Sequence, residues 1–277
     1  MQVLSTLGFF ATGTFQRELA DPVGISQPSI SGALPRVVDG INQLATQYIF
    51  FPYTAQQQLP VKRGFYSIAG LHNVIGALDC THVRIKAPSP DPFPYLNRKQ
   101  YHSINVQVIC DSDNHLLNVV SRFPGGAHYS YILQNSSVGM RLEQGAAGDA
   151  WLIGVRGYAL APWLMTPLTN PQTHQEASYN QRHARTRSTI ERTIGILKGR
   201  WMCLDTAGGK LLYKPEKSRS DFTETLRNLL LVIQDRIGDD TCSWTGPGDT
   251  YRGRPTAGRA EWCQVPLHRG VAWIGDL

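Results

Sequence analysis

Two acidic residues lie next to apolar residues, in segments with the pattern of a strand and of a helix. Asp79 lies in the middle of a strand-like run, GALDCTHVRIKAP, and Glu191 lies in the helix-like segment ARTRSTIERTIGILKGR. A carboxylate buried among apolar residues is costly unless it is paired, hydrogen-bonded or bound to a metal ion. Simpler roles stay open: a salt bridge to Arg84 or a satisfied hydrogen bond for Asp79, and a salt bridge to Arg187, one helical turn away, for Glu191.

Basic residues gather in the same helical segment as Glu191. The chain has 27 Lys and Arg against 21 Asp and Glu, a net charge of +6. A moderate basic excess permits a polyanionic partner without proving one, and its clustering is more informative than the total. Within residues 181–200 the only acid is Glu191, and the basic residues are Arg182, Arg185, Arg187, Arg192, Lys198 and Arg200.

The N-terminal stretch LADPVGISQPSISGALPRVV, residues 19–38, has the pattern of a helix-turn-helix unit. Gly24 can adopt the positive φ of a tight turn, and Ser26 can cap the helix that follows. Ile30 and Leu34 would face the first helix. An ordinary helical hairpin packed on the core explains the pattern equally well. If the unit binds DNA, its second helix would present Gln27, Ser29, Ser31 and Arg36 to phosphates or base edges.

The rest of the sequence excludes several classes of protein. The five cysteines form no C-x-x-C pair, which argues against a zinc site or a disulfide framework and favours a reducing compartment. The start of the chain has no basic n-region, so we do not expect a signal peptide. No run of 18 apolar residues predicts a membrane span.

Composition and periodicity divide the chain into four parts. Residues 1–50 are expected to be a helix-turn-helix segment, and residues 51–70, with Pro52, Pro60 and Gly64, a linker. Residues 71–236 carry an alternating α/β pattern. Residues 237–277 form a Gly/Pro-rich divergent tail whose composition permits disorder. Within the third part we predict strands over 74–86, 103–110, 115–122 and 151–155, and helices over 130–142 and 189–201.

Five collinear stretches resemble the Harbinger transposase-derived nucleases (the PIF/Harbinger family of the DDE endonuclease superfamily). The N-terminal FFATGTFQ and VGISQPSISGALPRV are also similar to that family, and the resemblance covers residues 5–217. The chain starts inside the family's helix-turn-helix region, and the likeness stops after YKPEK. We therefore expect N-terminal helices of the family to be missing and 218–277 to differ from it. The five stretches are LDCTHVRIKAP (78–88), NRKQYHSINVQVICD (97–111), NVVSRFPGGAHYSYILQNS (118–136), GYALAPWLMTPL (157–168) and HARTRSTIERTIGILKGRW (183–201).

The resemblance implies an α/β RNase H-like core, a mixed sheet flanked by helices, with acids that hold divalent Mg²⁺ or Mn²⁺ for DNA cleavage. The family's first acid falls on Asp79 and its last on Glu191. Its two other acidic positions are Tyr129 and Val155 in this chain. Valine has no donor atom, and a phenol is neutral at pH 7, whereas these ions prefer hard oxygen ligands. We therefore expect a weak metal site and impaired cleavage.

The resemblance also implies partners and a location. We expect Arg185, Arg187, Arg192 and Lys198 to contact DNA phosphates. The family implies a Myb-like DNA-binding partner and a nuclear location, with the cytoplasm a further option. Three functions stay open: a metal-dependent endonuclease, a non-catalytic DNA-binding adaptor, and a decayed copy without a role.

Overall fold

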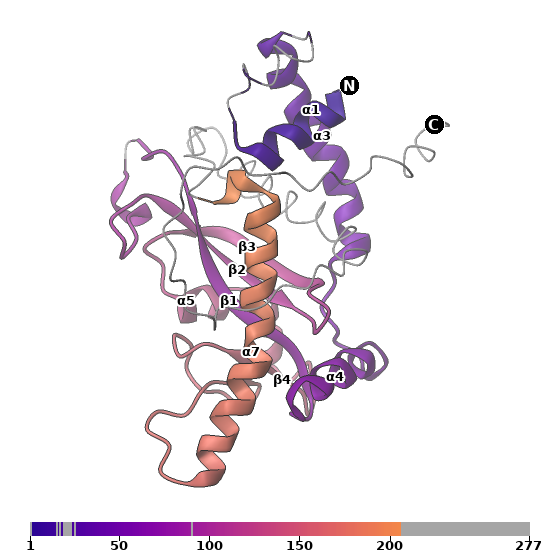
Figure 1. Cartoon of the computed structure of the whole chain (residues 1–277), viewed down its shortest axis with the longest axis vertical. Helices are drawn as coiled ribbons and strands as arrows, with labels where there is room; N and C mark the ends of the chain where they lie inside the picture. Colours follow the sequence, from indigo (N-terminus) through magenta and orange to yellow (C-terminus); the bar gives the residue numbers. More distant parts are fainter. Residues whose placement is uncertain are drawn as a thin grey trace, which may run out of the picture. The chain divides into compact units, whose positions relative to one another are not determined.

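A five-stranded mixed sheet forms the centre of the protein, in the strand order β3-β2-β1-β4-β5 (Figure 1). The computed structural model describes residues 2–14, 16, 18, 24, 26–89 and 91–205. β2 is antiparallel to both of its neighbours, whereas β4 runs parallel to β1 and β5 parallel to β4. The strands are β1 (Val74–Arg84), β2 (Ser103–Cys110), β3 (Leu116–Pro124), β4 (Trp151–Gly154) and β5 (Leu164–Met165).

The meander of β1, β2 and β3 follows from composition and turn chemistry. All eight residues of β2 are buried, as its β-branched run SINVQVIC suits a central strand. The turn into β3 places Asn114 at φ 69°, a left-handed conformation that asparagine tolerates better than most residues. The predicted strand over 103–110 has the bounds observed.

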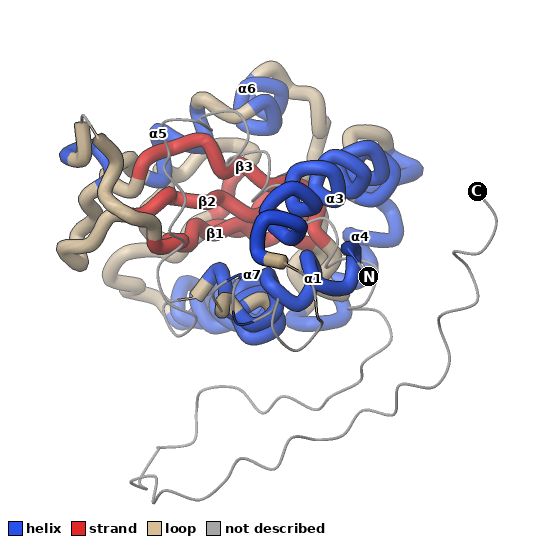
Figure 2. Tube along the Cα trace, turned by 90° about the horizontal axis from the view of Figure 1, so that it is seen from above, coloured by secondary structure: helices blue, strands red, loops and turns tan. Residues whose placement is uncertain are grey.

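Helices cover both faces of the sheet. Figure 2 shows α7 (His174–Arg200) and α1 (Gln2–Thr12) on one side, with α5 (Tyr129–Gln134) and α6 (Ser137–Glu143) on the other. Side chains alternate between the two faces along each strand, so two separate hydrophobic clusters form. A mixed sheet flanked by helices confirms the expected α/β RNase H-like fold.

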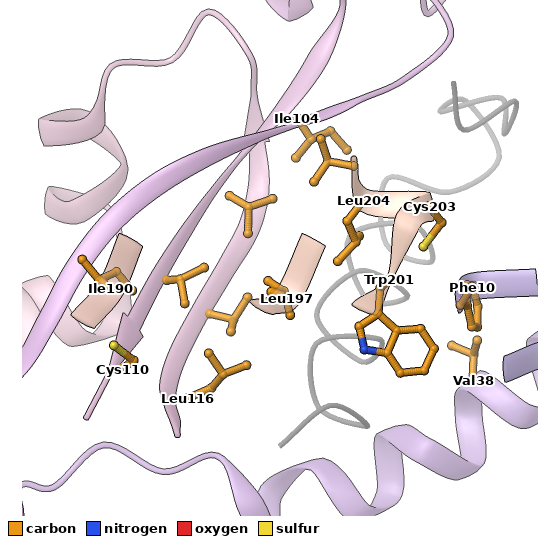
Figure 3. Packing of buried hydrophobic residues seen from close by; sticks show 14 of the residues in the cluster. Phe10, Val38, Ile104, Cys110, Leu116, Ile190, Leu197, Trp201, Cys203 and Leu204 are labelled. Atoms are coloured by element: carbon orange, nitrogen blue, oxygen red, sulfur yellow. The ribbon is translucent and has the colours of Figure 1, made fainter. Parts of the chain in front are cut away.

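The long helix α7 carries Glu191 across the sheet. It begins at a capping box in which Thr173 and Glu176 satisfy each other's backbone N–H groups. Its apolar face buries Ile190 and Leu197, which pack against strand residues such as Cys110 in Figure 3. The predicted helix over 189–201 is therefore correct but covers only the C-terminal half of α7.

The N-terminal helices pack on each other and on the end of α7. Ile30 and Leu34 of α3 (Gln27–Tyr48) join Phe9 and Phe10 of α1 in one cluster, as the helical-hairpin pattern predicts. The Ser26 side chain accepts the N–H of Ser29 and so caps α3. Figure 3 shows Trp201, Cys203 and Leu204, in and before the short 3-10 helix η2 (Met202–Leu204), beside Phe10 and Val38.

The segment that we predicted to be a linker is a packed helix, α4 (Ala55–Ala69). Thr54 and Gln57 form a capping box, and the Phe65 side chain is fully buried. The linker prediction is wrong because it took Gly64 as a sign of a flexible segment, whereas Gly64 lies inside a helix and is needed for packing. A Cβ at Gly64 would lie 2.0 Å from the Ser112 side chain. Glycine therefore allows α4 to approach the β2–β3 turn.

Two smaller differences concern the helix predicted over 130–142 and the C-terminal part of the chain. The predicted helix is interrupted, and Ser136 ends the gap by capping α6 through the N–H of Gly139. A 3-10 helix, η1 (Phe93–Tyr95), lies between β1 and β2. Residues 206–236 and the proposed tail 237–277 lie outside the described residues, so those domain boundaries stay predictions. Among the described helices, none is long and apolar enough to cross a membrane.

Candidate functional site

The candidate site lies where β4 ends beside the longer β1. The last residue pair between these strands is Leu78 with Gly154, so Asp79 is the first β1 residue beyond the paired region. Asp79 is paired on its other side with Val108 of β2. Because Val108 and Ala77 belong to the cluster beneath α7, the alternation of side chains places Asp79 on the α7 face.

Asp79 is a half-buried carboxylate under electrostatic strain. Its Oδ1 accepts the backbone N–H of Cys80 at 2.7 Å. Burial raises the pKa of Asp79 to about 6, although that hydrogen bond and the charge of Arg187 lower it, and the charge of Glu191 raises it further. The influence of both α7 residues places them in the electrostatic environment of Asp79.

Glu191 is already paired with an arginine. Its Oε1 accepts a hydrogen bond from Nη1 of Arg187 at 2.5 Å, four residues earlier on α7. The simpler role for Glu191 is therefore observed. Of the two simpler roles for Asp79, the hydrogen bond is observed, with the Cys80 N–H as its donor. The Arg84 guanidinium does not pair with Asp79 but lies over the Tyr101 ring, 5.4 Å from its centroid.

Tyr129 fills its position with a packed aromatic ring. Its ring lies against Gly157, where a Cβ would come within 2.6 Å of Cδ2. The ring of Tyr158 is 5.9 Å away, and the Arg98 guanidinium lies 6.0 Å from the Tyr129 centroid. Burial first, and then the charge of Asp79, raises the pKa of the Tyr129 phenol. The phenol therefore stays neutral near pH 7 and supplies no negative charge.

Val155 follows β4 directly and also packs rather than binds. It is a partly buried member of the cluster that contains Tyr129 and Tyr158. It also lines a cavity of about 380 Å³ together with Arg156, His183 and Arg187. Asp79 is thus within electrostatic range of Glu191 and of Tyr129, and Val155 follows the end of β4. Two of these four positions are not acids.

A buried polar network beneath Asp79 was missed at the level of sequence. The Cys80 thiol lies 3.2 Å from the Tyr158 hydroxyl, which donates to Oε1 of Gln107. Burial raises the pKa of Cys80 to about 12, so this thiol is not a nucleophile near pH 7. Alternation in the run 78–82 indicates the shared face, but only the tertiary fold brings Tyr158 to it.

The expected DNA contacts are distributed over several surfaces. Arg185 is exposed and Arg187 half-buried on α7. Arg192 is close enough to Cys110 for its charge to lower the pKa of that thiol, towards the end of β2. The Lys198 ammonium donates to the backbone oxygen of His82 at 3.0 Å. On α3 the exposed residues include all four that we expected to face DNA, Gln27, Ser29, Ser31 and Arg36.

A second acidic group occupies the turn between β2 and β3. One ligand atom from each of Asp111, Asp113 and His115 lies within 4.8 Å of the others, so the three could hold a metal ion. Asp111 also has a structural role, since it accepts the N–H groups of Asp113 and His115 and pairs with the His115 ring at 3.0 Å. In the sequence these three residues form the pattern D-x-D-x-H.

The sheet order, the long helix α7 on one face and an acid in the middle of β1, beside the end of β4, define an α/β protein of the RNase H-like class. Residues 78–224 match the DDE superfamily endonuclease family, and the chain belongs to it.

The resemblance to Harbinger transposase-derived nucleases is confirmed by individual relatives. The chain is 42% identical over 217 residues to the rat protein named "Putative nuclease HARBI1", which is 78% of this chain and 62% of the rat protein. The human protein of the same name is also 42% identical over 217 residues, with the same two coverages. The chain therefore spans less than two thirds of these relatives. No solved structure matches it significantly.

Proposed function

We propose that this chain is a transposase-derived DNA-binding protein with a nuclease fold whose own metal-dependent cleavage is impaired. The observation that carries the proposal is the packing of Tyr129 and Val155. Tyr129 and Val155 occupy the two positions where the family resemblance expects acids, and both are built into the apolar cluster beneath the sheet. Both side chains are neutral and pack against apolar neighbours, so neither supplies a charged ligand for a metal ion.

The donor set does not fit two divalent ions. Two ions about 4 Å apart require several carboxylates to offset their charge. Among the residues that the structure describes, we place two carboxylates near the end of β4, those of Asp79 and Glu191, and Glu191 is already paired with Arg187. We propose these two as the remaining catalytic and metal-binding residues, able to hold at most one Mg²⁺ or Mn²⁺ weakly. Their phosphate-cleaving chemistry would be correspondingly slow.

DNA binding does not depend on that metal. Electrostatic contact with phosphates needs only accessible cations. We propose that Arg185, Arg187, Arg192 and Lys198 provide them along α7, and that the exposed polar face of α3 adds contacts.

The second candidate is a purely non-catalytic adaptor, favoured by the pairing of Arg187 with Glu191, which leaves Asp79 without a second free carboxylate on α7. A Myb-like partner and a nuclear location belong to the proposal through the family alone.

Nicking of supercoiled plasmid by the purified chain in Mn²⁺ tests the impairment. We expect little or no nicking by the unmodified chain and, if a trace is present, its loss in Asp79→Ala. Nicking that is strong in the unmodified chain and abolished by Asp79→Ala would show that two carboxylates suffice. Strong nicking that Asp79→Ala leaves unchanged would remove Asp79 from the catalytic assignment.

A further inference from the structure

A pocket of about 650 Å³ opens on the face of the sheet opposite α7, next to Tyr129. Its walls come from three places: the segment 93–100 before β2, the turn 124–129 after β3, and the inward-facing His82 and Asn105 of β1 and β2. A volume of this order is typical of sites for small organic groups. Since Tyr129 also belongs to the candidate site, the pocket adjoins the place where a DNA strand would be held.

Aromatic and flat side chains line this pocket. The Phe93 side chain at its edge is 80% exposed, an unusual position for a large apolar ring in a folded protein. Tyr129 and His128 also line the pocket, and their rings are stacked on each other with centroids 5.9 Å apart. An exposed aromatic ring such as that of Phe93 favours a planar ligand, because stacking on it is insensitive to the ligand's edge pattern.

A hydrogen-bond acceptor without a partner lies in the pocket wall. Asn105 is fully buried, and its Nδ2 donates to the carbonyl oxygen of Ala127 at 2.9 Å. That contact fixes the orientation of the amide and leaves Oδ1 with no hydrogen-bond partner. Buried polar atoms in native proteins are nearly always satisfied. A planar ligand with an N–H or NH₂ group on its edge would satisfy this oxygen.

Positive charges lie in the pocket wall and near it. Arg98 lines it directly. Burial lowers the pKa of His82 to about 4, and the charges of Lys198, Lys99 and Arg98 lower it further. The imidazole is therefore neutral at pH 7 and stands within reach of three positive charges. Among the described residues that line the pocket there is no aspartate or glutamate, so a ligand with a phosphate is favoured over a neutral or cationic one.

We propose that this pocket receives a single unpaired nucleobase, stacked on Phe93 with its amino edge towards Asn105 and its phosphate near Arg98. Nucleobases combine the planar faces, the N–H donors and the attached phosphate that the three features require. The inference rests on the proposed DNA binding and deepens it, because the chain would recognise DNA in which one base lies outside the double helix.

Binding of three oligonucleotide duplexes to the full chain, measured by fluorescence anisotropy, tests this proposal. One duplex is fully paired, one carries a single bulged adenosine, and one carries an abasic residue at the same bulge. We expect the adenosine bulge to bind about tenfold more tightly than the abasic bulge, the gain typical of stacking one base. Phe93→Ala should abolish most of this preference. The matched control is Phe50→Ala, since Phe50 is also more than half exposed but does not line the pocket.

Equal affinity for the two bulges, or a preference that survives in Phe93→Ala, would overturn the proposal. Binding of free deoxyadenosine monophosphate separates it from the proposed function. If no duplex binds but the free nucleotide does, and Phe93→Ala abolishes that binding, base recognition stands and the DNA-binding function fails. If neither a duplex nor the nucleotide binds, both fail.

Discussion

At the scale of single residues, the site is defined by the mismatch between Asp79 and its neighbours. Asp79 places a carboxyl group where burial disfavours its charged form. Neither Tyr129 nor Val155 offers a carboxylate to a metal ion, and both pack against apolar neighbours. A carboxyl whose pKa burial raises this far is a candidate functional residue.

The strain at Asp79 has a testable effect on stability. Burial raises the pKa of Asp79 from 3.8 to about 6, so the folded protein holds this proton more tightly than the unfolded chain. The resulting stabilisation is complete below about pH 4 and is lost as the pH rises through 6. Asp79→Asn keeps an acceptor for the Cys80 N–H and removes the charge. It should raise the free energy of unfolding by about 1–3 kcal/mol at pH 8 and change it little at pH 4.

Urea denaturation at the two pH values measures this difference. Asp113→Asn, an exposed carboxylate in the β2–β3 turn, serves as the matched control and should show no such gain at pH 8. If Asp79→Asn destabilises the protein at pH 8 as much as at pH 4, Asp79 has a structural role that the charge does not oppose.

At the scale of elements, apolar periodicity predicted the parts that depend on a local pattern. The strand over 103–110 was correct because its burial and its β-branched composition agree. The N-terminal half of α7, HQEASYNQRHAR, was missed because it has few apolar residues to mark a face. The helix α4 was missed because Pro60 and Gly64 are ordinary linker signals, whereas the role of Gly64 depends on Ser112, far along the chain.

Substitutions in α4 distinguish a packed helix from a linker. Phe65 is fully buried, whereas the neighbouring Tyr66 is 49% exposed. Phe65→Ala should lower the free energy of unfolding by about 3–5 kcal/mol, the usual cost of removing a buried aromatic ring. Tyr66→Ala should change it by less than about 1 kcal/mol. Equal and small effects in thermal or urea unfolding would mean that α4 does not belong to the core in solution.

At the scale of the whole molecule, the candidate site could be predicted only in part. Asp79 and Glu191 were identified from motifs, but pairing of Glu191 with Arg187 and packing of Tyr129 against Gly157 depend on how α7, α5 and the turn after β4 meet. The Cys80–Tyr158 contact and the pocket around Asn105 likewise join residues far apart in the chain. Long-range contacts of this kind leave no local pattern.

The basic residues of α7 lead to a further prediction. If α7 contacts DNA phosphates, the dissociation constant for duplex DNA should rise steeply with salt, and Arg185→Gln should reduce the slope of log Kd against log salt by about 1. Arg141→Gln, on α6 and therefore on the opposite face of the sheet, is the control. An affinity that is independent of salt, or slopes altered equally by both substitutions, would contradict phosphate binding by α7.

The most direct measurement compares Mn²⁺-dependent nicking of supercoiled DNA by the unmodified chain and by the double variant Tyr129→Asp with Val155→Asp. We predict that the double variant cuts, that the unmodified chain does not, and that adding Asp79→Ala to the double variant abolishes cutting. Asp113→Asn in the same background should leave it unchanged, which excludes the group in the β2–β3 turn. A double variant that stays folded and still does not cut would show that the loss of these two carboxylates is not the whole cause of inactivity. Cutting by the unmodified chain at the level of the double variant would contradict the impairment itself.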